Sequence, residues 1–309
     1  MVAVRSEHYM SGASITVLMG GPDAERDISI HSGQAIAHAL RESGSFLVEE
    51  LVIDTPTIQD IQNIRCDAIF PALHGPFGEG GPLQELLEQC GKSFVGSASK
   101  PARHAMDKVA TKQTAEELSI LTPKWCLVTK ETKCTITPPL VLKPNDDGSS
   151  VDVAICRTDS ELQQKCTELL CGRKQLLAEQ YIQGRELTVG IVNGKVLPII
   201  EIIPPANAQS YDYEAKYQSD ETEYVVSPDL PNNNCCEVAL QLYNAMDIRD
   251  LARVDFLLDQ HGACWLLEIN TMPGFTNHSL LPMAAEHAGL PMEDLCTQLV
   301  LAALARQVK

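Results

Sequence analysis

Apolar runs of strand length alternate with helical stretches along the first third of the chain. The pattern predicts strands at 15–19, 47–53 and 68–71, and a helix at about 29–42 between the first two strands. This alternation favours a parallel sheet, because parallel strands need a long crossover connection that a helix usually fills. The sequence therefore predicts an α/β unit at the amino-terminal end.

A second unit follows residue 96. The polar stretch NDDGSS separates two strand-like segments, which indicates a hairpin. The expected elements of this unit are a helix near 106–118, strands at 140–143 and 151–156, a helix at 160–171 and a strand at 175–181.

A third unit begins at about residue 185. Strand-like segments at 187–192 and 195–203 flank Asn193-Gly194, and this dipeptide is a strong hairpin signal because both residues tolerate a positive φ. Boundaries near 96 and 184 divide the chain into three units, which are 1–96, 97–184 and 185–309.

Polar residues interrupt two apolar segments near the carboxyl-terminal end, in RVDFLLDQHGACWLLEIN. If His261-Gly262 forms the turn of an antiparallel hairpin, Asp255 lies opposite Glu268 and Arg253 lies opposite Asn270. Period-two alternation then places all four side chains on one face. Two carboxylates with an amide oxygen are hard ligands, suited to Mg²⁺ or Mn²⁺. An ion pair on a solvated face is the simpler alternative, and a register slip of one residue would separate the four side chains.

A candidate phosphate-binding loop lies in the second unit, in KPNDDGSS at 143–150. Lys143 ends a predicted strand, and backbone N–H groups after Gly148 could cradle phosphate oxygens. An ordinary surface hairpin explains the same residues equally well. Two other nucleotide motifs are excluded, because Gly91-Lys92-Ser93 has Leu86 where a P-loop requires glycine and GPFGEGG does not match G-x-G-x-x-G.

The composition of the chain limits the classes of binding partner and the cellular compartment that we expect. The 309 residues include 24 Lys and Arg and 41 Asp and Glu, a net charge of −17. This argues against nucleic acid as the main partner, because phosphate binding needs clustered positive charge. The apolar stretches are shorter than the ~20 residues of a membrane helix, so we expect no membrane partner. We find no export signal, and eleven cysteines without C-x-x-C spacing fit reduced thiols in the cytosol better than a disulfide framework or a zinc site.

Seven segments in this order resemble the D-alanine–D-alanine ligases of the ATP-grasp superfamily, and the resemblance covers nearly the whole chain. The segments are GGPDAERDISIHSG at 20–33, HGPFGEGGPLQELLE at 74–88, MDK at 106–108, KPNDDGSSV at 143–151, AEQYIQGRELTVGI at 178–191, YDYEAKY at 211–217, and RVDFLLD through LEINTMPGFTNHSLLPMAA at 253–285.

This resemblance implies a three-domain α/β ATP-grasp fold. Residues 1–96 would form an N-terminal domain with a parallel sheet that binds substrate and dimerises, 97–184 a central lid, and 185–309 the C-terminal catalytic domain. The implied enzyme is a cytoplasmic homodimer that uses ATP to join two D-alanines, through D-alanyl phosphate, for peptidoglycan precursors.

The resemblance also assigns residues to ATP and to two ions of Mg²⁺ or Mn²⁺. The family has lysine where this chain has Gln180, but the contacts there are largely backbone. The assigned residues are Lys108, Lys143, Ser149, Lys216 and Asn270 near the phosphates, Glu179, Gln180, Tyr181 and Ile182 near adenine, Glu186 at the ribose, and Asp255, Glu268 and Asn270 at the metal.

The amino acid substrates are assigned in the same way. Glu25 matches the carboxylate that holds the ammonium of the first D-alanine, with His74 beside it, and Ser149, Tyr217 and Glu25 match the group that joins two closing loops. Arg253 and the Gly274 amide match the groups facing the developing oxyanion, and Ser279 and Leu280 match the contacts to the second carboxylate.

Each of these residues has a simpler alternative outside the family context. Glu25 could be a charge in the first turn of a helix, His74 a loop histidine, Tyr217 a packed aromatic and Ser279 a helix N-cap. A residue can serve in both ways, since a helix N-terminus also favours carboxylates.

Two positions depart from the family pattern. Gly80 stands where the family generally has Asp, and Asp152 adds a negative charge after the candidate phosphate loop. Three other functions compete with the D-alanine–D-alanine ligase. They are a D-alanine–D-lactate ligase, another ATP-grasp ligase for a different acid and amine, and a catalytically silent nucleotide-binding protein.

Overall fold

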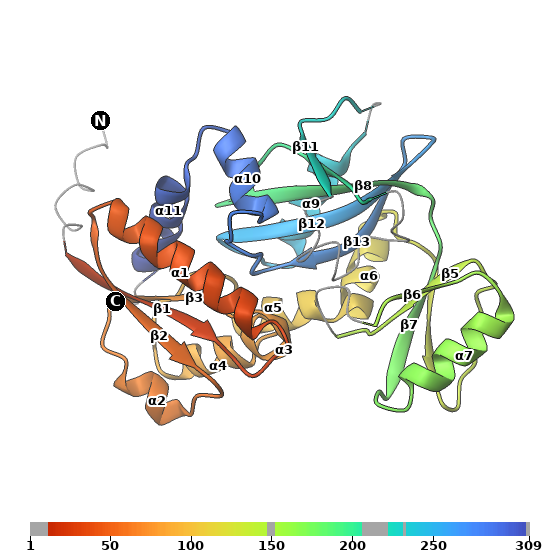
Figure 1. Ribbon diagram of the computed structural model, residues 1–309, viewed down its shortest axis with the longest axis horizontal. Coiled ribbons are helices and arrows are strands. Elements are labelled where there is room, and N and C mark those ends of the chain that lie inside the picture. Colours follow the sequence, from red (N-terminus) through yellow and green to blue (C-terminus); the bar gives the residue numbers. More distant parts are fainter. Residues whose placement is uncertain (1–11, 147–151, 206–221, 231–232, 307–309) are drawn as a thin grey trace.

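The computed structural model describes residues 12–146, 152–205, 222–230 and 233–306 of the chain. Within these ranges the strands form three sheets that follow one another along the long axis of the molecule (Figure 1). The sheet formed by the later part of the sequence lies between the other two.

The first sheet is parallel, as the alternating pattern predicts. Helix α1 connects its first two strands and begins three residues before the predicted start at residue 29. The strand order is β2-β1-β3, with bounds β1 Ala13–Gly20, β2 Phe46–Ile53 and β3 Ala68–Pro71. The accompanying helices are α1 Arg26–Glu42, α2 Ile58–Asn63, α3 Gly75–Gly78 and α4 Pro82–Gln89.

The last two helices of the chain pack on this first unit. Helices α10 (Leu280–His287) and α11 (Met292–Ala305) lie beside α1 in Figure 1, and Leu299 shares a buried core with Ile36 and Leu40 of α1. In the ranges that the structure describes, no single helix is long and apolar enough to cross a membrane, although α10 and α11 pass by length and composition as a pair bent by 106°.

The central part of the chain begins with two helices rather than one. The helix expected near 106–118 is present and starts two residues later than expected, because Asp107 caps it; the helix before it was not expected. The Asp107 carboxylate accepts the N–H groups of Val109 (2.9 Å) and Ala110 (3.1 Å), as an aspartate N-cap does. The two helices are α5 Ser99–Met106 and α6 Lys108–Glu117.

A four-stranded antiparallel sheet follows, in the order β4-β7-β5-β6. Strands β5 and β6 form the predicted hairpin, with Leu140 opposite Cys156. The described part of the second strand is shorter than predicted and begins at Ala154. The bounds are β4 Trp125–Thr129, β5 Leu140–Lys143, β6 Ala154–Cys156 and β7 Gln175–Gln180, with α7 Asp159–Leu169 beside them.

The third sheet has the order β11-β10-β8-β12-β13, and β9 pairs with β8. Asn193 (φ 49°) and Gly194 (φ 73°) make the predicted hairpin turn between β8 and β9. The predicted strand 195–203 is in fact two strands, with Pro198, which has no N–H, between them. The bounds are β8 Gly184–Val192, β9 Lys195–Val196, β10 Ile200–Ile203, β11 Glu223–Val226, β12 Leu251–Asp259 and β13 Cys264–Asn270, with α9 Cys235–Ala245 packed on the sheet.

The hairpin of β12 and β13 has the predicted pairs but not the predicted turn. Asp255 lies opposite Glu268 and Arg253 opposite Asn270, as expected. Near the turn, however, the Asp259 N–H donates to Ala263 O, so the loop has one more residue than predicted. A β-bulge after Asp255 restores the register, and the four polar side chains share one face for this reason.

One pair of cysteines departs from the expected reduced state. Cys235 at the start of α9 and Cys264 on β13 form a disulfide, and the other nine cysteines are free thiols. The expectation of reduced thiols is therefore wrong for this pair, which joins α9 to the sheet beneath it. The two cysteines are 29 residues apart and do not form a C-x-x-C motif, so the sequence pattern does not predict this disulfide.

Candidate active site

A cavity of about 550 Å³ lies between the central sheet and the third sheet, within the usual size range of ligand pockets. Apolar side chains from the two sheets line it, among them Val141 and Ile155 on one side and Leu257 on the other. Of the residues assigned from the sequence, the cavity is lined by Lys108, Lys143, Glu179, Gln180, Tyr181, Ile182, Glu186, Asp255 and Glu268.

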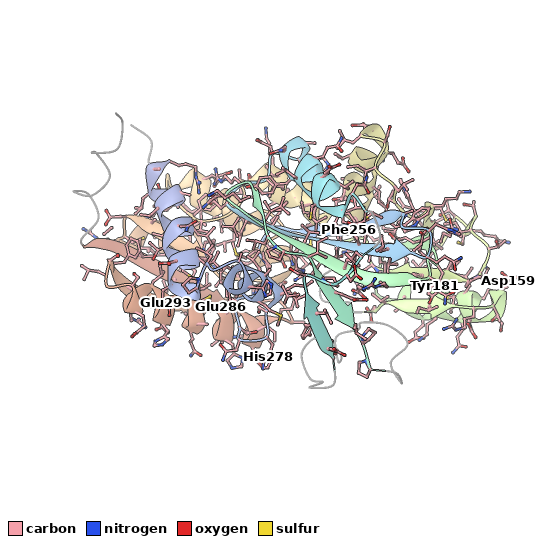
Figure 2. All side chains as sticks on the ribbon, turned by 90° about the horizontal axis from the view of Figure 1, so that it is seen from above. Asp159, Tyr181, Phe256, His278, Glu286 and Glu293 are labelled. Carbon is pink, nitrogen blue, oxygen red and sulfur yellow. A yellow bond between two sulfur atoms is a disulfide. The ribbon has the colours of Figure 1, made fainter. Side chains whose placement is uncertain are left out.

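The end of β7 and the residues that follow it form one wall of this cavity. The Gln180 N–H donates to Lys124 O (2.8 Å), and the Tyr181 N–H donates to Pro139 O (3.2 Å). Because these two N–H groups are already hydrogen-bonded within the protein, a nucleotide in the cavity would bind other backbone groups of this segment. Figure 2 shows Tyr181 between Phe256 of β12 and Asp159 at the start of α7, where the third and central sheets approach each other.

The two predicted phosphate lysines lie at the base of the candidate phosphate loop. Lys108 is the first residue of α6, and its N–H donates to Asn145 O (3.1 Å). The Asn145 side chain in turn accepts the Val109 N–H (3.0 Å) and donates to Asp107 (2.9 Å). Asn145 is buried, so the start of KPNDDGSS is part of the interior and not an ordinary surface hairpin. Sequence reasoning missed Asn145, although it lies inside the motif.

Buried charges cluster beside these lysines. Glu179 contacts Lys143 Nζ with one oxygen and Lys112 Nζ with the other, each at 2.7 Å. Burial alone would raise the pKa of the Glu179 carboxyl, but the two lysines outweigh it and hold this pKa below its ordinary value. Lys112 was not among the residues predicted from the sequence. Its spacing of one helical turn after Lys108 was the signal that could have indicated it.

The paired residues of β12 and β13 form a compact polar group. Arg253 holds both oxygens of Asp255 (3.0 and 2.8 Å), and Thr188 donates to Asp255 Oδ1 (2.6 Å). Lys108 Nζ lies 3.4 Å from Glu268 Oε2. Asp255 is buried and lines the cavity, which argues against an ion pair on a solvated face.

The donor set at this hairpin fits a divalent cation. Asp255 and Glu268 face the cavity from adjacent strands, and Asn270 Oδ1 accepts one N–H, from Met272 (2.8 Å), which leaves it a second lone pair. Among the described residues, no three His, Cys, Asp or Glu side chains form a metal site by themselves, so a cation bound here would need the Asn270 oxygen as a third ligand.

His74 and Ser32 connect the first unit to the loop after β13. His74 Nδ1 lies 3.1 Å from Met272 O, and since a carbonyl only accepts, Nδ1 carries the proton. Ser32 Oγ accepts the Phe275 N–H (3.1 Å) and lies 3.4 Å from His74 Nε2. The pKa of His74 is lowered to about 4, mainly by burial; the Met272 hydrogen bond opposes the change, and the nearby charge of Arg253 adds to it. His74 is therefore a neutral, buried histidine and not an exposed loop residue.

Two glutamates of the first unit, Glu25 and Glu79, are buried. Glu25 occupies the N-cap position of α1 but makes no capping hydrogen bond with its side chain, and it is buried, so it is not a solvated first-turn charge. Glu79, which sequence reasoning did not select, accepts the Gly75 N–H (3.1 Å). Burial raises the pKa of Glu79 to about 8, and the nearby charge of Glu25 contributes to the rise.

The loop before α10 brings Gly274 and Ser279 together. A Cβ at Gly274 would lie 2.8 Å from Ser279 Oγ, so a side chain there would displace the Ser279 hydroxyl. Ser279 occupies the N-cap position of α10, yet its hydroxyl accepts the Thr276 N–H (2.8 Å) and does not cap the helix. Leu280 is the first residue of α10 and is buried.

The two departures from the family pattern have local explanations. A Cβ at Gly80 would lie 2.3 Å from Pro76 O, so this backbone leaves no room for a side chain there. Asp152 forms an ion pair with Arg173 (2.7 Å), which compensates its charge. Ser149, Lys216 and Tyr217 lie outside the described residues.

Comparison with known proteins agrees with this geometry. Residues 115–301 match a family model described as D-ala D-ala ligase C-terminus. The D-alanine–D-alanine ligase of Aquifex aeolicus is 37% identical over 291 residues, which cover 93% of this chain and 99% of that protein. The chain belongs to the D-alanine–D-alanine ligase family. The ligase of Bordetella petrii is also 37% identical, over 93% of this chain and 90% of its own length.

Solved structures of D-alanine–D-alanine ligases have the same ATP-grasp fold. A Bacillus anthracis ligase complexed with ATP superposes with a TM-score of 0.80 at 29% identity, covering 96% of this chain and 98% of its own. The Coxiella burnetii ligase gives a TM-score of 0.83 at 25% identity, over 96% of this chain and 95% of its own. The fold expected from the resemblance is confirmed.

Proposed function

We propose that this chain uses ATP to join two D-alanines into D-alanyl-D-alanine for peptidoglycan synthesis. The observation that carries the proposal is the cavity between two sheets, which combines an apolar cleft, two lysines at one end and the facing carboxylates of Asp255 and Glu268. This arrangement suits a nucleotide whose phosphates meet positive side chains.

In the first step, a carboxylate oxygen of one D-alanine attacks the γ-phosphorus of ATP, which gives D-alanyl phosphate and ADP. Lys108 and Lys143 reduce the charge repulsion between the two anions, and Lys216 adds a phosphate contact when the loops close. Asp255, Glu268 and Asn270 would hold two ions of Mg²⁺ or Mn²⁺, and the metal would supply further positive charge to the phosphate oxygens.

In the second step, the amine of another D-alanine attacks the acyl carbon, and phosphate leaves. Arg253 and the Gly274 amide stabilise the developing oxyanion, as hydrogen-bond donors aimed at that position do. Glu25, with His74 beside it, holds the ammonium of the first D-alanine. Ser279 and the start of α10 at Leu280 bind the second carboxylate, because a helix N-terminus favours negative charge.

The remaining assignments complete this proposal. Glu179, Gln180, Tyr181 and Ile182 bind adenine and Glu186 binds the ribose, while Ser149 and Tyr217 join the closing loops and exclude water from the acyl phosphate. The three domains are 1–96, 97–184 and 185–309, and the enzyme works in the cytoplasm.

We also propose a homodimer formed through the N-terminal domain. The edge strand β2 supports this, because it exposes Leu47 (66%) and Val52 (52%), and natural sheets rarely leave an apolar edge open. Sedimentation at several protein concentrations would measure the oligomer, and a monomer at all of them contradicts this part of the proposal.

The function is tested by incubating the chain with MgATP and D-alanine and identifying the products by mass spectrometry. We expect equal amounts of ADP, phosphate and D-alanyl-D-alanine, and none of the dipeptide with L-alanine. D-lactate offered as the second substrate distinguishes a D-alanine–D-lactate ligase, which would form a depsipeptide with it. Nucleotide binding without turnover of any of these acids would contradict the proposal.

A further inference from the structure

The buried Lys112 has no place in the reaction described above, yet it contacts groups at the centre of the nucleotide site. The residue lies on α6 and is 0% exposed. Its Nζ lies 2.7 Å from Glu179 Oε1 and donates to Thr122 Oγ1 (2.5 Å). Thr122 in turn donates to Leu266 O of β13 (3.0 Å). Lys112 thus connects α6, the central sheet and the third sheet.

Burying this ammonium is costly unless a charge compensates it. Burial lowers the pKa of Lys112, and the charge of Glu179 opposes that change. Glu179 is itself buried and receives Lys143 on its other oxygen, also at 2.7 Å. The three side chains therefore form a Lys–Glu–Lys triad, and two positive charges share one negative charge.

The sharing has a consequence for Lys143, the lysine that lines the cavity. Without Lys112, Glu179 and Lys143 would form a neutral pair, and the carboxylate could draw the Lys143 ammonium away from the phosphates. With Lys112 in place, each lysine takes one carboxylate oxygen. The triad then keeps a net charge of about +1 beside the phosphates, since one carboxylate cannot neutralise both ammonium groups.

We propose that Lys112 is a positioning residue for ATP, which acts on the phosphates through Glu179 and Lys143 without touching them. This role of Lys112 deepens the proposed function. It rests on that function only in one respect, which is that the cavity must bind a nucleotide. Because Lys143 is the member of the triad assigned to the phosphates, loss of Lys112 should weaken phosphate binding more than adenine binding.

The test measures equilibrium binding of ATP and of adenosine to the whole chain, without D-alanine. Lys112→Met keeps a long apolar side chain in the buried site and removes the charge. We expect ATP to bind at least about tenfold more weakly, as for loss of a charge-assisted contact, and adenosine to lose much less affinity than ATP. Lys100→Met, an exposed lysine on α5, is the matched control and should change neither.

A second variant tests the route through the carboxylate. Because Glu179→Gln removes the charge that draws Lys143 away, Lys112→Met should cost much less ATP affinity in the Glu179→Gln background than alone. Equal losses for ATP and adenosine, or the same cost in both backgrounds, would show a purely structural role and overturn the proposal. A lower melting temperature with unchanged ATP affinity would also overturn the proposal.

Failure of the proposed function and failure of the role of Lys112 give different results. A chain that binds ATP but does not ligate D-alanine contradicts the proposed function, while the comparison of ATP with adenosine still decides the role of Lys112. A chain that binds no ATP contradicts both.

Discussion

The buried neutral state of His74 predicts a specific loss of stability in acid. The pKa of this imidazole is about 4 in the folded protein, against about 6.5 for an unperturbed histidine. Between these values the unfolded chain binds the proton and the folded one does not, so stability is fully present above pH 6.5 and falls as the pH falls towards 4. For one group with these two pKa values, the loss is about 2 kcal/mol at pH 5 and about 3 kcal/mol at pH 4.

The assay is urea unfolding of the chain without ligands, at pH 7.5 and at pH 5. Carboxylates also titrate in acid, so the informative quantity is the difference between the unaltered protein and His74→Gln, which cannot take up this proton. We expect the stability advantage of the unaltered protein to shrink by about 2 kcal/mol between the two pH values. His38→Gln, at an exposed position on α1, is the control and should leave the pH dependence unchanged. A constant difference between the unaltered protein and His74→Gln would refute the reasoning.

Three further predictions follow from the site. Arg253→Ala should lower kcat about 10²- to 10³-fold with a smaller effect on ATP affinity, measured by steady-state kinetics and nucleotide binding; near-normal turnover would contradict the oxyanion role. Asn270→Ala should raise the Mg²⁺ concentration needed for half-maximal activity, and an unchanged metal titration would argue against this ligand. Gly80→Asp should lower stability by about 1–3 kcal/mol in urea unfolding, because the new Cβ meets Pro76 O. The control is Gly172→Ala, which should be nearly neutral because its added Cβ meets nothing within 4 Å.

The sequence predicts this fold well wherever a local pattern determines it. The parallel sheet follows from alternating apolar runs, and the turn at Asn193-Gly194 follows from two residues that tolerate positive φ. The facing pair Asp255 and Glu268 also follows from the pattern, although the turn has an extra residue and a bulge compensates for it. Local periodicity cannot reveal two such irregularities, because their effects on the register cancel.

The parts of the site that the residues alone did not indicate depend on contacts distant in sequence. Lys112 and Glu179 are 67 positions apart, and Asn145 reaches the start of α6 from the candidate phosphate loop. The disulfide of Cys235 likewise depends on how α9 lies on the sheet. Burial of Glu79 changes its chemistry, and no composition or spacing rule indicates that a glutamate in a Gly-rich loop is enclosed.

The most direct test of the central claim follows the carboxylate oxygens of D-alanine. The chain is incubated with MgATP and D-alanine labelled with ¹⁸O in both carboxylate oxygens, and the phosphate and dipeptide are analysed by mass spectrometry. Attack of the carboxylate on the γ-phosphorus, followed by loss of phosphate from the acyl carbon, predicts one ¹⁸O in each phosphate released and an equal amount of D-alanyl-D-alanine. Unlabelled phosphate, or ADP released without dipeptide, would contradict the account.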